Sequence, residues 1–131
     1  MQLVDTNIIS ELLRPRPNPG VLAWASDQRK FAIAAISVDE SVYGLVRNRN
    51  PVLLAAYEAL LCKRGEVLAT TKEIAQRAGT LRGDFSLRGI SRSQADMLIA
   101  ATAQHHNLTL VTRNTRDFEG CGIGLLNPFT D

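Results

Sequence analysis

Four acidic side chains lie where strand-like segments give way to helices or polar loops: Asp5, Glu40, Asp96 and Asp117. In an open α/β sheet the carboxyl ends of the strands meet at one crevice, so acids far apart in sequence can come together there. Carboxylates that share a crevice repel one another, and a bound cation relieves that repulsion. Oxygen-only ligands favour Mg²⁺ or Mn²⁺. A divalent metal held by carboxylates is suited to phosphodiester chemistry, which is the chemistry that this pattern indicates.

Short apolar segments alternate with helical patterns along the chain, and this alternation determines where the acids would lie. Strands are expected at residues 1–5, 31–36, 66–70, 108–112 and 123–126. Helices are expected at residues 6–13, 21–28, 37–47, 51–62, 71–81 and 94–105, with Thr71 and Ser93 as the caps of the last two. Links or loops are expected at 14–20 and 113–120, and residues 83–91 are expected to be a loop or a frayed helix end. This order predicts an α/β fold whose mostly parallel sheet is covered by helices on both faces. The length is typical of one domain, so residues 1–131 are expected to form a single domain.

Three of the acids also have structural explanations that depend on the start of a helix. Asp5 could cap the first helix, although Thr6 is also available as the cap and would leave Asp5 free. Ser37 and Glu40 have the spacing of a capping box, in which Glu40 would only bond back to the Ser37 amide. Asp96 lies in a first helical turn, where an acid complements the helix dipole. The apolar run after Asp96 nevertheless places it at the rim of the core, where a carboxylate needs a cation.

Asp117 lies in a polar stretch after the fourth expected strand, where several side chains compete for one role. Thr112 and Asn114 lie closer to the strand end and could also bind a metal, directly or through water. In a structural alternative, Asp117 pairs with Arg113 or Arg116. The sequence therefore leaves open which residue completes the site.

Composition narrows the class of protein. Hydrophobic residues make up 45% of the chain, a normal value for a globular protein, and no apolar run reaches the ~18 residues of a membrane span. The first residues do not have the pattern of a signal peptide, so cytoplasmic residence is expected. Two cysteines without metal-type spacing, Cys62 and Cys121, are expected to be free thiols in that compartment.

Charge gives a weaker indication of the partner. The net charge is only +2, but twelve of the fifteen basic residues are arginine, which suits bidentate contacts with phosphate. The arginine content could equally reflect genome composition. Lys30, Lys63 and Lys72 fall away from the acids, which argues against an acidic phosphoryl-acceptor site, and no glycine-rich phosphate loop or Cys–His zinc pattern occurs.

Several stretches occur together in an order and spacing that resemble a known family. They are Leu3 to Leu12, Ile36 to Glu40 with Tyr43 and Gly44, Ala95 to Ala103, Leu110 to Asn114 with Arg116 to Glu119, and Asn127 to Phe129. The chain resembles the PIN-domain family and, more narrowly, the VapC-like (FitB-like) toxins of bacterial type II toxin–antitoxin systems. The resemblance implies a Rossmann-like α/β/α sandwich and a ribonuclease site that depends on Mg²⁺ or Mn²⁺.

The resemblance also implies roles for individual residues. Asp5, Glu40 and Asp96 take the positions of the family's first three acids and would hold the metal, and Asp117 or Asn114 would take the less uniform fourth position. Contacts to the RNA are expected from the polar residues around these acids, which are Thr6, Asn7, Thr112, Arg113, Asn114 and Arg116. The RNA would be a tRNA or a ribosomal RNA.

Partners are implied by the resemblance as well. A cognate antitoxin, VapB-like or FitA-like, would bind the protein, and operator DNA would be bound only through the antitoxin. A homodimer is expected, with the helices at residues 21–28 and 51–62 as candidate contact surfaces. The alternative function is a catalytically weak binding module that keeps the fold but acts mainly through the antitoxin and operator DNA.

Overall fold

A parallel five-stranded sheet forms the centre of the computed structural model, which describes residues 1–131. The strands follow the order β3-β2-β1-β4-β5, and all four pairings are parallel. Their bounds are β1 Leu3–Val4, β2 Phe31–Ala34, β3 Gly65–Leu68, β4 Leu110–Val111 and β5 Leu125–Leu126. Because every strand runs the same way, the carboxyl ends of all five face one edge of the sheet.

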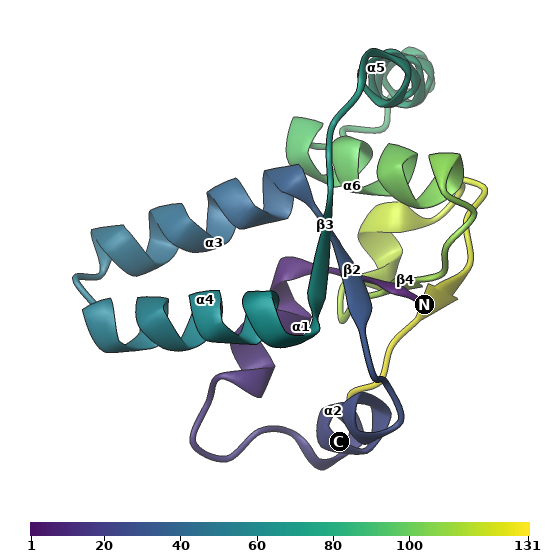
Figure 1. Ribbon diagram of the computed structural model, residues 1–131. Helices are drawn as coiled ribbons and strands as arrows, with labels where there is room; N and C mark the ends of the chain where they lie inside the picture. Colours follow the sequence, from purple (N-terminus) through teal and green to yellow (C-terminus); the bar gives the residue numbers. More distant parts are fainter.

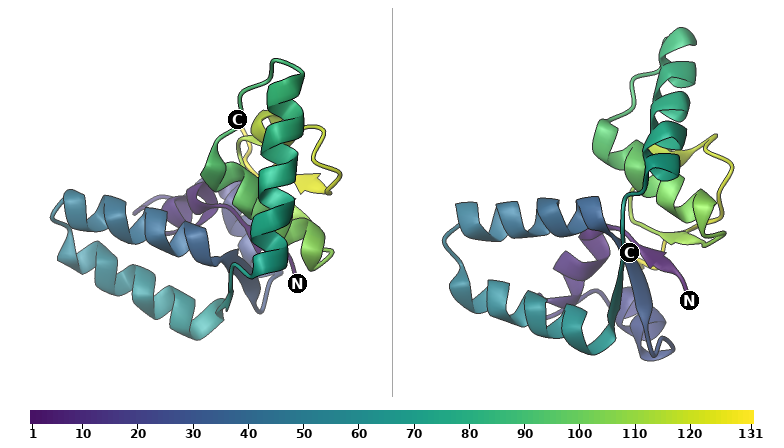
Figure 2. Two further views of the ribbon diagram at one scale, coloured as in Figure 1. Left: turned by 90° about the horizontal axis from the view of Figure 1, so that it is seen from above. Right: turned by 45° about the horizontal axis from the view of Figure 1, so that its top comes forward.

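Helices cover both faces of this sheet (Figure 1). The helices are α1 Thr6–Leu12, α2 Pro19–Ser26, α3 Ala35–Arg47, α4 Pro51–Arg64, α5 Lys72–Leu87 and α6 Gln94–His105, with a 3₁₀ helix, η1, at Thr115–Phe118. One face carries α5 and α6, and the other carries α1, α2 and the end of α4, while α3 and α4 extend away from the sheet as a pair (Figure 2). The α/β/α architecture expected from the sequence is thereby confirmed.

The strands are buried on both faces, and their side chains alternate between two cores. Ala32 and Ala34 of β2 belong to the core under α5 and α6, whereas Phe31 and Ile33 belong to the core under α1, α2 and α4. In β4, Leu110 belongs to the core under α5 and α6, and Val111 belongs to the core under α1, α2 and α4. Alternation with a period of two is what a pleated strand between two helical layers requires.

The helix α3 begins earlier than expected. It starts at Ala35, so Ser37 lies inside the helix, fully buried, and its hydroxyl has no hydrogen-bond partner. The capping box of Ser37 and Glu40 is therefore wrong, because only a residue before the first turn can cap it. Strand β2 is correspondingly shorter than the expected 31–36 and ends at Ala34.

The helix α5 continues further than expected. It runs to Leu87, although residues 83–91 contain glycine and were expected to form a loop or a frayed helix end. The apolar stripe of Ile74, Ala78, Leu81 and Phe85 keeps helical spacing and packs into the core beside α6. Burial of Phe85 therefore outweighs the intrinsic preference of Gly83 against a helix.

Other features agree with the sequence more closely. Thr71 and Ser93 cap α5 and α6 through their hydroxyls, and both cysteines are free, Cys62 exposed and Cys121 buried. No helix has the length and apolar character needed to cross a membrane.

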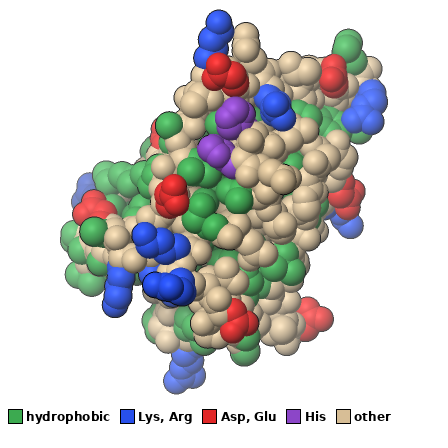
Figure 3. Space-filling view, turned by 45° about the vertical axis from the view of Figure 1, so that its right-hand side comes forward, with side chains coloured by type: hydrophobic (Ala, Val, Ile, Leu, Met, Phe, Trp, Pro, Cys, Tyr) green, Lys and Arg blue, Asp and Glu red, His purple; other side chains and the backbone are tan.

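On the face drawn in Figure 3, acidic and basic side chains are interspersed and the two histidines lie together, with ring centres 5.0 Å apart. The polar stretch 113–120 includes η1, whose Phe118 is buried.

Candidate active site

A pocket of about 470 Å³ opens at the carboxyl edge of the sheet. Its lining is strongly polar and consists of Asp5, Thr6, Asn7, Ser10, Glu11, Arg14, Glu40, Asp96, Arg113, Asn114 and Phe129. Three of the four predicted acids thus lie together, although they come from the end of β1, from α3 and from α6. Their convergence follows from the parallel sheet, which collects the strand ends at one edge.

Asp5 caps a helix and also lines the pocket. Its Oδ1 accepts a hydrogen bond from the Thr6 amide at 2.8 Å, so Asp5 caps α1 and Thr6 is the first helical residue. Its Oδ2 accepts from the Thr112 hydroxyl at 2.8 Å and from Asn7 Nδ2 at 3.3 Å. The expectation that Thr6 caps the helix is wrong, and the two proposed roles of Asp5 coexist. Burial raises the pKa of Asp5, although these three bonds oppose the rise.

Two polar side chains join the loop after β4 to Asp5. The Thr112 hydroxyl, which donates to Asp5, also accepts from the Asn114 amide at 3.0 Å. Asn7 Oδ1 accepts from the Arg113 amide at 3.2 Å. Thr112 is fully buried and does not line the pocket, whereas Asn7, Arg113 and Asn114 do. Thr112 therefore orients its neighbours, and the other three face the space where a substrate would bind.

Glu40 reaches the pocket from the second turn of α3. Its Oε1 lies 3.4 Å from the Thr6 hydroxyl, which donates to it. Partial burial raises the pKa of Glu40, and the negative charges of Asp5 and Asp96 raise it further. The carboxylate is thus within electrostatic reach of both other acids.

Asp96 stands in the first turn of α6, where its amide donates to the Oγ of the cap Ser93 at 3.0 Å. Burial raises the pKa of its carboxyl group. The Ser93 hydroxyl and Arg92 oppose this rise in pKa, while Asp5 and Asp117 add to it. Asp96 therefore lies in the first turn of its helix, as the sequence predicts, and also lines the pocket together with Asp5 and Glu40.

Asp117 stands apart from the other three acids. It is exposed on η1 and does not line the pocket, although its negative charge adds to the raised pKa values of Asp5 and Asp96. It forms no ion pair with Arg113 or Arg116, because the chain's one ion pair joins Arg14 and Glu11. Of the two candidates for the fourth position, Asn114 lines the pocket and Asp117 acts on it from a distance.

The acids fit a divalent cation by their chemistry. Asp5, Glu40 and Asp96 offer only oxygen ligands, their pKa values are all raised, and none of them forms an ion pair with a basic side chain. A bound cation would supply the missing positive charge. No three acidic, histidine or cysteine side chains of the chain are already close enough to hold an ion, so water or a rotated side chain would complete the coordination.

The chain is similar over its full length to proteins of one family. The family model described as the PIN domain matches residues 3–121. The chain belongs to the PIN-domain family. It is 32% identical to the toxin FitB of Neisseria gonorrhoeae over all of both chains, and 32% identical to the VapC ribonuclease Y4jK of Sinorhizobium fredii over 98% of each. A solved toxin–antitoxin complex from Klebsiella pneumoniae contains a similar chain, with a TM-score of 0.77, 29% identity and complete coverage of both.

Five residues of this PIN domain's site were not anticipated from the sequence. Ser10, Glu11, Arg14 and Phe129 line the pocket. Arg92 donates to the backbone carbonyls of Asp117 and Glu119, the latter at 2.9 Å. Glu11 could have been found, because it lies four residues after Asn7 and so shares its helix face. Nothing local in the sequence places Phe129 beside the acids, because only the fold brings it there.

Proposed function

We propose that this PIN-domain protein is a ribonuclease toxin that depends on Mg²⁺ or Mn²⁺ and is neutralised by an antitoxin. The observation that carries the proposal is the polar pocket in which Asp5, Glu40 and Asp96 lie without any basic partner. Similarity over the full chain to a toxin, to a VapC ribonuclease and to a chain of a toxin–antitoxin complex supports the choice of RNA as substrate and an antitoxin as partner.

In this proposal Asp5, Asp96 and Glu40 hold the metal. When bound, a divalent cation would neutralise phosphate charge and lower the pKa of water, so that hydroxide is available near neutral pH. Thr6 and Asn7, at the start of α1, offer a hydroxyl and an amide to the phosphate, and Asn114 offers a further amide. Arg113 and Arg116 bind the RNA backbone. The proposed substrate is a tRNA or a ribosomal RNA. In the same proposal, residues 1–131 form one domain and the protein acts in the cytoplasm.

A catalytically weak binding module is the second candidate function. It is favoured by one observation, which is that no metal-binding group is already assembled among the acids. Such a module would act through the antitoxin and, by way of the antitoxin, on operator DNA. Both candidates share the antitoxin and a homodimer as expected partners, so binding of an antitoxin does not separate them.

The test is cleavage of total bacterial RNA by the purified protein without antitoxin, in Mg²⁺, in Mn²⁺ and in EDTA. We expect cuts at defined sites that both EDTA and Asp5→Asn abolish. Asp27→Asn is the matched control, because Asp27 is an exposed acid at the end of α2, outside the pocket. Folded protein that cuts no RNA with either metal would instead favour the binding module.

A further inference from the structure

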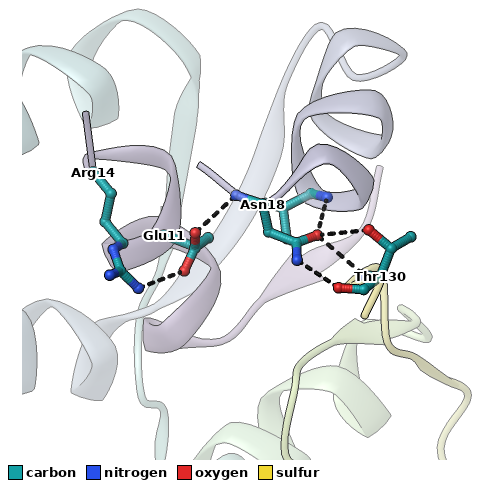
Figure 4. A network of polar contacts seen from close by, with 5 residues as sticks. Glu11, Arg14, Asn18 and Thr130 are labelled. Carbon is teal, nitrogen blue, oxygen red and sulfur yellow. Dashed lines mark hydrogen bonds and ion pairs between the residues drawn. The ribbon is translucent and has the colours of Figure 1, made fainter. Parts of the chain in front are cut away.

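The pocket contains a fourth carboxylate, Glu11, which is buried and already committed to partners within the chain. Its Oε2 accepts a hydrogen bond from the Asn18 amide at 2.8 Å, and its Oε1 forms an ion pair with Arg14 Nη1 at 3.4 Å (Figure 4). Only 8% of Glu11 is exposed. Glu11 therefore differs from Asp5, Glu40 and Asp96, because it has a basic partner and they have none.

Asn18 continues this network into residues 127–131, which we call the strap. Asn18 Nδ2 donates to the Thr130 carbonyl at 2.6 Å, and its Oδ1 accepts from the Thr130 amide at 3.0 Å (Figure 4). The side chain thus pairs with both backbone groups of Thr130, as a neighbouring strand would. The same Oδ1 accepts from the Gly20 amide at 2.9 Å and caps α2.

The strap packs very closely on the start of α2. A Cβ atom at Gly20 would lie only 2.2 Å from the Pro128 carbonyl oxygen, so only glycine fits at this contact. Together with the Asn18 bonds, this close approach fixes the position of Phe129 between Pro128 and Thr130. Phe129 is the one hydrophobic residue in the lining of the pocket.

Phe129 in turn holds an arginine. The guanidinium carbon of Arg113 lies 4.6 Å from the centre of the Phe129 ring, which is the geometry of a cation–π contact. Arg113 and Arg14 are the two arginines that line the pocket. Neither pairs with Asp5, Glu40 or Asp96, because Arg14 is bound by Glu11 and Arg113 is stacked on Phe129.

We propose that Glu11 and the strap are positioning elements that keep Arg14 and Arg113 away from the three carboxylates at which a metal would bind. A guanidinium free to rotate onto an acidic pocket would neutralise it and compete with the cation. Glu11 prevents this for Arg14 by an ion pair. Phe129, fixed by Asn18, prevents it for Arg113 and leaves that guanidinium at the pocket rim for a phosphate.

This inference rests on the proposed metal site, but its test is binding of Mg²⁺ alone, measured by calorimetry on protein without RNA. Phe129→Leu retains apolar volume and removes the ring, so Arg113 is released. We expect Mg²⁺ binding to weaken roughly two- to fivefold, the range set by the strength of an exposed cation–π contact. Adding Arg113→Gln to Phe129→Leu should restore the binding of Mg²⁺, because the competitor is then absent.

The second arm of the test separates the proposed role of Glu11 from that of a metal ligand. Glu11→Gln retains an acceptor for the Asn18 amide but loses the ion pair, and we expect weaker Mg²⁺ binding that Arg14→Gln restores. If Glu11 were a ligand, Mg²⁺ binding would stay weak in the double variant. That outcome, or unchanged binding in both Phe129→Leu and Glu11→Gln, would overturn the inference.

The third arm concerns the strap itself. Asn18→Asp retains the oxygen that caps α2 and removes the donor to Thr130, so hydrogen exchange at the amides of residues 129–131 should become faster and Mg²⁺ binding weaker. Asn50→Asp is the matched control, because Asn50 caps α4 through the same oxygen at 3.1 Å to Leu53 and lies outside the pocket. Faster exchange in Asn18→Asp with no change in Mg²⁺ binding would contradict the positioning role.

The failures of the two proposals are distinguishable. If the wild-type protein binds Mg²⁺, the single variants bind it less well and the double variants that also lack the arginine regain it, the inference stands even when no RNA is cut. If the wild-type protein cuts RNA but the variants bind Mg²⁺ equally, the inference alone fails. A folded wild-type protein that binds neither Mg²⁺ nor Mn²⁺ would overturn both.

Discussion

The carboxylate of Asp5 contributes both to the fold and to the candidate site. Its oxygens cap α1 and bind the Thr112 hydroxyl, so the side chain is fixed by the fold. Its charge, in contrast, is unfavourable there, because it is 6% exposed and has no basic partner. A buried carboxylate without a counter-ion is a common sign of a functional position, since the fold alone gains nothing from the charge.

The first prediction is that Asp5→Asn stabilises the metal-free protein. The amide oxygen of asparagine caps a helix as well as aspartate does, and the Thr112 hydroxyl can turn from donor to acceptor at the new NH₂ group. Only the weaker bond from Asn7 Nδ2, at 3.3 Å, is lost. We expect the free energy of unfolding in EDTA to rise by on the order of 1 kcal/mol, measured by urea denaturation. Asp27→Asn should leave it unchanged. A destabilised Asp5→Asn variant would contradict the view that this charge is unfavourable in the fold.

The second prediction concerns pH. Carboxyl groups whose pKa is raised by folding bind more protons in the folded state than in the unfolded state. Below the unfolded pKa values of about 3.8 to 4.5, the stability that they contribute is fully present. This contribution is lost as the pH rises through the raised pKa values of the folded state. Mg²⁺ requires the ionised groups. The increase in Tm on adding Mg²⁺ should therefore grow from about pH 4 to about pH 8 and be near zero at the acid end.

The measurement is a thermal melt at each pH with MgCl₂ and with KCl at equal ionic strength. The KCl series controls for general screening of charge. Asp5→Asn should show a smaller Mg²⁺ effect at every pH. An Mg²⁺ effect that is independent of pH would mean that the cation binds elsewhere than at these carboxylates.

At the scale of the elements, the start of α6 determines where Asp96 lies. The Ser93 hydroxyl accepts the amide hydrogen of Asp96 itself, so the cap and the acid belong to one turn. Thr71 caps α5 in the same way, accepting from the Ile74 amide at 3.2 Å, but that turn lies outside the pocket. The two caps therefore offer a matched comparison between stability and function.

The third prediction uses this pair. Ser93→Ala and Thr71→Ala should each lower the free energy of unfolding by about 1 kcal/mol, because each leaves a helix amide without its cap. Only Ser93→Ala should also slow RNA cleavage, since only that turn carries an acid of the pocket. Ser93→Thr should behave like the wild-type protein in both assays. An equal loss of cleavage in Thr71→Ala would show that activity follows stability alone.

The elements also show what the sequence could and could not predict. The parallel sheet, the two hydroxyl caps and the gathering of Asp5, Glu40 and Asp96 were predictable, because they depend on alternation of elements and on strand ends. The early start of α3 at Ala35 and the continuation of α5 to Phe85 were not, because tertiary packing outweighs local capping and glycine signals. The contact of Phe129 with Arg113 joins residues that only the complete fold brings together.

At the scale of the whole molecule, positive and negative charges nearly balance, whereas acidic side chains outnumber basic ones in the lining of the pocket. The net charge is +2, and charges of both signs are interspersed on the face in Figure 3. Binding of a polyanion next to three carboxylates must then depend on a few basic side chains near the pocket rather than on the field of the whole protein. Arg113 lines the pocket, and Arg116 follows on the exposed side of η1.

The fourth prediction is that these arginines determine how RNA binding depends on salt. Each phosphate contact on single-stranded RNA contributes about 0.7 to the slope of log K against log salt concentration. With Asp5→Asn as the background that binds without cutting, Arg113→Gln and Arg116→Gln should each reduce the slope by about that amount. Arg29→Gln is the matched control, because Arg29 is exposed just before β2, at the opposite edge of the sheet from the pocket. If Arg29→Gln reduced the slope equally, RNA binding would follow net charge, and the two arginines beside the acids would have no special part in it.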